Sequence, residues 1–165
     1  MQDELLDFEG NPENLGPENN VGFGLRLAAI IIDGILLWSV QAVITYAMFG
    51  TWTMQPEDPM DPMSIFGPDY YTLMGISTFF GIVYHVGMWV YADGATLGKK
   101  AVKIKVVRND DGGPIGIGTA IGRYFSYILS YIPCFLGFLW VIWDNEKRGW
   151  HDKICNTKVV PAEAK

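Results

Sequence analysis

An acidic residue, Asp33, lies inside a long apolar segment that runs from Leu25 to Phe49. A helix of about 20 apolar residues crosses the hydrocarbon core of a bilayer, so this segment is predicted to span a membrane. A carboxylate at that depth costs about 2.5–3.5 kcal/mol on insertion scales, and it is normally paired, turned toward the protein interior or functional. The fold must therefore supply partners for Asp33.

Arg26 precedes Asp33 by about two helical turns, so the two side chains share one face of the predicted helix. They lie roughly 10 Å apart along the axis, at about 1.5 Å per residue, which is too far for a direct ion pair. Each needs a partner from another segment. Arg26 could instead reach lipid phosphates as an interfacial anchor. For Asp33, a buried structural pair and a transport role both fit the pattern.

The charged residues are few, at 18% of the chain, and they are clustered by sign. The first twenty residues and the loop at 50–69 contain acids but no Lys or Arg, whereas bases gather in 99–108 and 147–158. Cytoplasmic loops of membrane proteins carry an excess of Lys and Arg. We therefore expect residues 50–69 outside, and the N-terminus and both basic segments in the cytoplasm. The charge pattern reports topology, and we expect no nucleic-acid partner.

A second spanning helix is predicted from Tyr70 to Ala92, with aromatic residues at both ends. The third apolar segment, Thr119–Trp143, is interrupted by Pro133. Because both of its flanks are basic, we favour a re-entrant hairpin that is broken at Tyr131–Cys134. A third crossing, with the C-terminus outside, is the alternative.

Between these segments, Ala101–Val107 alternates apolar residues with lysines, which predicts a half-buried strand. Thr157–Val160 is a second short strand candidate that could pair with it. The predicted fold is thus an all-α integral membrane domain with a small cytoplasmic two-stranded β ribbon. This domain would occupy residues 21–160, between a disordered acidic tail at 1–20 and a C-terminal tail at 161–165.

Other polar residues lie within the apolar segments or directly beside them. Arg123 is the expected counter-charge to Asp33, and His85 could join a proton relay or simply be a hydrogen-bonded core residue. Lys99 and Lys100 follow Gly94-Ala-Thr-Leu-Gly98, whose spacing does not fit a phosphate-binding loop. We expect both lysines at the anionic headgroup surface.

Enzymatic chemistry is not expected. His151-Asp152 lacks an accompanying nucleophile, so a capping or charge-pairing role is expected for Asp152. Neither the histidines nor Cys134 and Cys155 have the spacing of a metal site. No cofactor is predicted.

Taken together, these segments resemble the RDD family of small multi-pass membrane proteins, named for one arginine and two aspartates. The resemblance identifies Arg26 and Asp33 in GLRLAAIIID and Asp152 in RGWHDKICNTKVV as the signature residues. The stretch GATLGKKAVKIKVVRNDDGGPIG and the Arg123 segment that follows it also look similar. Some members of this family have been proposed to be cation/proton antiporters.

Two functions follow as expectations. One is cation/proton transport by a homo-oligomer in the bacterial cytoplasmic (inner) membrane, since so few helices enclose little volume. The other is a non-catalytic accessory or assembly subunit of a larger membrane complex, in which the signature charges form a structural lock.

Overall fold

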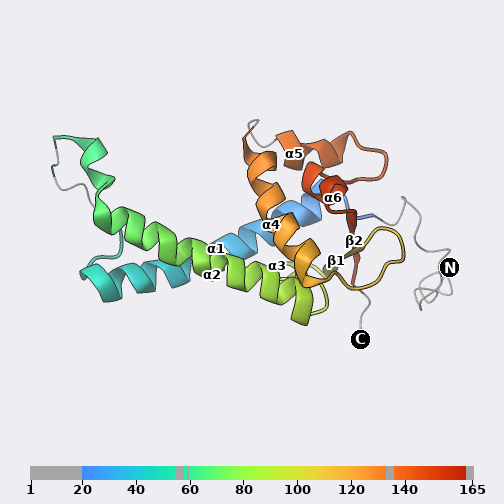
Figure 1. Cartoon of the computed structure of the whole chain (residues 1–165), viewed down its shortest axis with the longest axis horizontal. Helices are drawn as coiled ribbons and strands as arrows, with labels where there is room; N and C mark the ends of the chain where they lie inside the picture. Colours follow the sequence, from blue (N-terminus) through green and yellow to red (C-terminus); the bar gives the residue numbers. More distant parts are fainter. Residues whose placement is uncertain (1–19, 55–57, 59, 133–135, 163–165) are drawn as a thin grey trace.

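Two long helices extend from a group of short elements at one end of the molecule (Figure 1). They are α1 (Phe23–Phe49) and α2 (Pro68–Tyr91), and both predicted long helices are therefore confirmed. The computed structural model describes residues 20–54, 58, 60–132 and 136–162. Gly50 ends α1 in the left-handed conformation, at φ 71°, and donates its N–H to the carbonyl of Tyr46.

Most of the apolar surface of α1 and α2 is uncovered. Within the described residues, these two helices are long and apolar enough to cross a membrane, and only 11% of the most apolar part of each is buried. Ile35, Trp38 and Phe79 are among the large side chains that remain exposed. A core helix of a soluble domain would be mostly covered, so a bilayer or another membrane protein is the natural surrounding for these faces.

The third apolar segment forms short helices. They are α4 (Ile117–Tyr131), α5 (Leu136–Leu139) and the 3-10 turn η5 (Trp140–Ile142). The predicted break at Tyr131–Cys134 falls between α4 and α5, and Pro133 itself lies outside the described residues. With 15 residues, α4 is about 22 Å long and shorter than the roughly 30 Å hydrocarbon core.

Helix α4 is polar on its inner side and apolar on its outer side. Arg123, Ser126 and Ser130 are buried, whereas Phe125 and Ile128 are exposed. This distribution is the reverse of a surface helix in a soluble protein. It fits a helix whose outer face meets lipid and whose inner face meets polar groups of its own chain.

The predicted ribbon is confirmed. Strands β1 (Ile104–Arg108) and β2 (Thr157–Pro161) pair in antiparallel fashion, with Val106 opposite Val159. The predicted start of the first strand at Ala101 is wrong, because Thr96 caps a short helix, α3 (Leu97–Ala101), that occupies this stretch. The chain then turns through Lys103, at φ 55°, before β1 begins.

The pairing of β1 with β2 brings distant parts of the chain to one end. Strand β1 precedes α4, and β2 follows the short helix α6 (Trp150–Ile154), so both flanks of the α4–α5 segment meet in one ribbon. Val21, just before α1, donates its N–H to the carbonyl of Val159 at 2.9 Å. The start of α1 therefore lies at the same end (Figure 1).

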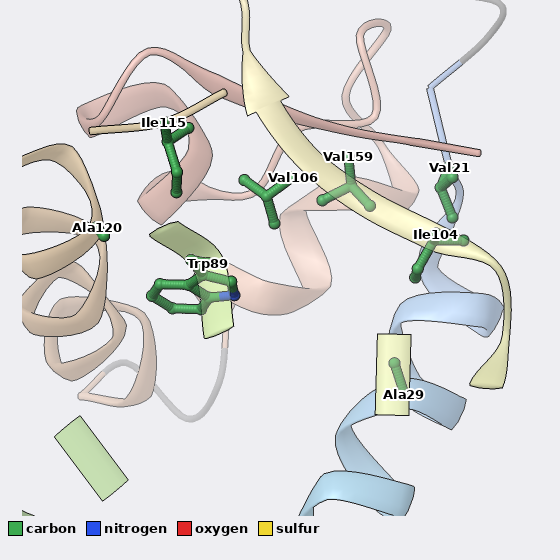
Figure 2. Packing of buried hydrophobic residues seen from close by; sticks show 8 residues of the cluster. All are labelled: Val21, Ala29, Trp89, Ile104, Val106, Ile115, Ala120 and Val159. Carbon is green, nitrogen blue, oxygen red and sulfur yellow. The ribbon is translucent and has the colours of Figure 1, made fainter. Parts of the chain in front are cut away.

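A small apolar core holds this end together. Figure 2 shows Trp89, from the last turns of α2, below Val106 and Ile115, while Val21, Ala29 and Ile104 gather around the start of α1. Trp89 and Val106 are fully buried. This core fixes the ends of α1 and α2 against the ribbon and so positions the signature residues.

The remaining predicted regions lie largely outside the described residues. The predicted disordered tail at 1–20 is described only at Asn20, and the predicted C-terminal tail only at Pro161, which ends β2, and Ala162. In the acidic loop at 50–69, the 3-10 turn η4 (Pro62–Ile65) is capped by the Asp61 side chain.

Candidate functional site

Asp152, in α6, is the centre of a buried charge cluster. Its side chain has 0% exposure, and its two carboxylate oxygens contact different guanidinium groups. Arg26 Nη1 contacts Oδ2, and Arg123 Nη2 lies 2.5 Å from Oδ1. One carboxylate thus bridges α1 and α4.

The same three residues also form hydrogen bonds with the surrounding backbone and with a side chain of β2. Asp152 Oδ2 accepts the N–H of Gly149 at 3.0 Å, which caps the start of α6. Arg26 donates to the carbonyls of Val21, at 2.9 Å, and Lys147, at 2.7 Å. Arg123 also donates to the Thr157 hydroxyl in β2. The cluster therefore ties α1, α4, α6 and the ribbon together.

The electrostatics of this cluster favour an ionised Asp152 and a neutral His151. Burial alone would raise the pKa of Asp152, but Arg123 and Arg26 outweigh it, and the pKa lies well below the usual range. Burial lowers the pKa of His151 to about 3; Asp152 opposes this shift and Arg123 adds to it. His151 packs against the Tyr127 and Phe138 rings, so it serves as a neutral packing residue here.

Asp33 is held by neutral donors. Its Oδ1 accepts from the Tyr84 hydroxyl and from the Gly98 N–H, both at 2.7 Å, and its Oδ2 accepts from the Thr96 hydroxyl at 2.6 Å. The predicted pairing of Asp33 with Arg123 is wrong, because Arg123 is directed at Asp152. As the sequence required, Arg26 and Asp33 each find a partner in another segment.

The cradle around Asp33 requires a glycine at position 98. A Cβ atom there would lie 2.2 Å from the Ala29 carbonyl oxygen and 2.8 Å from Asp33 Cγ. These separations are far below van der Waals contact, so only glycine lets α3 approach α1 this closely. Tyr84, Thr96 and Gly98 were missed as site residues. Nothing in the spacing of the Gly94-Ala-Thr-Leu-Gly98 stretch indicates that it folds back onto α1.

Lys99 points inward, against the prediction that it lies at the headgroup surface. Its residue exposure is 7%, and its Nζ lies 5.4 Å from the centre of the Trp89 ring. Burial lowers the pKa of Lys99 to about 7, and nearby Arg123 lowers it further while Asp33 opposes the shift. The short α3 turns successive side chains to different faces, so Lys100 is exposed while Lys99 is not. The position of Lys100 at the headgroup surface stays a prediction.

His85, the suggested relay residue, faces a cavity. Its Nδ1 lies 2.9 Å from the Gly81 carbonyl oxygen, and its ring packs against Tyr84, Trp89 and Tyr124. The cavity between α1, α2 and α4 has a volume of about 490 Å³, and Asp33, His85 and Lys99 line it. The site thus has two parts: the charge cluster around Asp152, and the Asp33 cradle beside the cavity.

The described residues do not assemble a metal site. No group of three or more His, Cys, Asp or Glu side chains there could hold a metal ion. The absence of enzymatic activity stays a prediction from sequence.

Comparison with known proteins gives a family match over most of the chain. The model of the RDD family matches residues 21–156. The uncharacterized protein YxaI of Bacillus subtilis (strain 168) is 33% identical over 150 residues, which cover 87% of this chain and 98% of YxaI. The proline-rich antigen homolog of Mycobacterium tuberculosis (strain H37Rv) is 37% identical over 84 residues, covering 49% of this chain and 35% of the antigen. No solved structure matches the chain.

Proposed function

The chain belongs to the RDD family, and we propose that it is a multi-pass protein of the bacterial cytoplasmic membrane that acts as a non-catalytic accessory subunit of a larger membrane complex. In this proposal α1 and α2 cross the bilayer, and α4–α5 form a shallow segment that enters and returns. The signature charges lock the cytoplasmic end, and the uncovered faces of the long helices meet lipid and the partner protein.

The observation that carries this proposal is that the signature charges already have partners within the chain. Arg26 and Arg123 bind Asp152, and Asp33 accepts three hydrogen bonds from its own fold. A carrier needs an ionisable group that exchanges its partners during transport. Fully paired charges suit a fixed structural lock better.

The pairing of β1 with β2 supports the proposed topology. The ribbon joins the two basic segments at one end of the molecule, and the positive-inside rule assigns that end to the cytoplasm. A third crossing would separate the two strands by the thickness of the bilayer.

Cation/proton exchange by a homo-oligomer is the second candidate, and one observation favours it. Asp33 and His85 line the same cavity, which would give a proton or cation a polar surface between the helices. Oligomerisation would be needed to complete a path through the membrane.

Reconstitution into liposomes separates these candidates. We expect wild type and Asp33→Asn to show the same cation/proton flux as protein-free liposomes, with Asp69→Asn, at the exposed start of α2, as the matched control. Flux above that background that is lost in a folded Asp33→Asn protein would overturn the accessory role.

In mild detergent, we expect the native chain to migrate with a fixed second protein rather than as a self-oligomer.

A further inference from the structure

Beyond its proposed role as a subunit, we propose that the cavity between α1, α2 and α4 binds an amphiphilic anion, with its acid group on Lys99 and its acyl chain between the helices. The inference does not depend on the accessory role, because it rests on the shape and charge of the cavity alone. The occupant is either an anionic membrane lipid or a free long-chain acid, which share this chemistry.

The first support is an ammonium group without an ion-pair partner. Lys99 is more than nine-tenths buried and lines the cavity. Its side chain forms no ion pair or hydrogen bond with any of the described residues, and its Nζ lies over the Trp89 ring. Leaving a buried charge unpaired is costly, so an anion that reaches Lys99 would stabilise its protonated form. Basic pockets between membrane helices bind anionic headgroups by this contact.

The second support is the charge balance of the region. Three basic side chains and two carboxylates interact electrostatically in one buried group that includes Lys99. They are Arg26, Lys99, Arg123, Asp33 and Asp152. The carboxylate of Asp152 is taken by the two arginines, and that of Asp33 by three neutral donors. The five side chains sum to one positive charge when Lys99 is protonated, and Lys99 is the basic group among them that forms no ion pair with a carboxylate.

The third support is the apolar shape of the rest of the cavity. Its volume of about 490 Å³ lies within the usual range of small-molecule sites, about 300–1,000 Å³. Along α2 its lining runs from His85 to Met74, about 16 Å at about 1.5 Å per residue. That length is about half of the 30 Å hydrocarbon core, the depth reached by the acyl chain of one leaflet. Leu37, Ile82 and Ile128 line this part.

A binding experiment tests the proposal. Purified full-length protein in mild detergent is equilibrated with radiolabelled palmitate, and bound label is measured after rapid gel filtration. We expect Lys99→Met, which keeps the apolar stem over Trp89, to weaken binding about tenfold or more. Lys100→Met removes the exposed neighbouring amine and should bind palmitate as the wild type does.

Two further arms make the result decisive. Methyl palmitate, which lacks the charge, should bind weakly; equal binding of ester and acid, or unchanged binding by Lys99→Met, would overturn the proposal. If Lys99→Met does not fold, Ile82→Trp is the alternative variant, because it fills the cavity and leaves the Lys99 amine in place. Unchanged palmitate binding by Ile82→Trp would also overturn the proposal. Competition by phosphatidylglycerol but not phosphatidylcholine would identify a membrane lipid as the occupant, and competition by neither would identify a free acid.

Discussion

Asp152 and Asp33 are both buried carboxylates, but their partners differ in charge. Asp152 neutralises two guanidinium groups, whereas Asp33 is stabilised by two hydroxyls and one backbone N–H. Because both of its partners are charged, Asp152 also neutralises two buried arginines that would otherwise lack a counter-charge. The three donors make Asp33 sensitive to any movement of α3. The two aspartates of the signature therefore have different structural duties.

Replacing Asp152 with Asn should be among the most destabilising single changes in the chain. It removes the charge between Arg26 and Arg123, which leaves two buried guanidinium groups uncompensated. Breaking a buried pair in this way costs about 3–5 kcal/mol. The measurement is the free energy of unfolding in detergent. Glu146→Gln, which breaks the more exposed pair with Arg148, is the control and should cost no more than about 1 kcal/mol. Similar losses for the two variants would contradict the lock.

The short helix α3 joins the Asp33 cradle to the cavity. Its N-terminal residues bind Asp33, and its Lys99 reaches toward the cavity and Trp89. A five-residue helix has little stability of its own, so its position depends on the Thr96 cap and on close packing against α1. Interfering with that packing should disturb the Asp33 cradle without touching Asp33.

Gly98→Ala tests this dependence. The added methyl group would lie 2.2 Å from the Ala29 carbonyl oxygen, so α3 must move away and the Gly98–Asp33 hydrogen bond must lengthen or break. We expect a loss of about 1–3 kcal/mol, the cost of leaving a buried polar group unsatisfied. In Gly118→Ala, the added Cβ meets nothing within 4 Å, and the helix propensity of alanine should leave stability unchanged or raise it by up to about 1 kcal/mol. Equal thermal unfolding midpoints for the two variants would rule out the close approach.

Elements with a strong local pattern could be predicted from the sequence, whereas the choice of partners could not. The length of α1 and α2 and the alternation before Arg108 predicted two helices and a ribbon. The partner of Arg123 depends on where α6 packs, which periodicity does not report. Lys99 was misplaced for the same reason: its direction follows from the Thr96 cap and the fold of α3 onto α1.

On the scale of the whole molecule, three segments that are distant in the sequence meet at one end. The start of α1, the exit of α2 through α3 and β1, and the C-terminal β2 are joined by backbone hydrogen bonds and by the Asp152 cluster. The opposite ends of α1 and α2 extend away from this group (Figure 1). In the proposed topology, this arrangement places the signature residues on one side of the bilayer and the 50–69 loop on the other.

This asymmetry predicts a labelling pattern in cells. In a background without Cys134 and Cys155, single cysteines replace Met60 in the loop, Asp110 after β1 and Lys153 in α6, all exposed positions. We expect a membrane-impermeant maleimide to label Met60→Cys in intact cells, and the other two only after permeabilisation, because the positive-inside rule predicts that their Lys- and Arg-rich segments are cytoplasmic. The Asp110 and Lys153 variants must behave alike, since the β1–β2 ribbon joins their segments. If Lys153→Cys is labelled from outside and Asp110→Cys is not, the third segment crosses the membrane and the β1–β2 ribbon does not form there.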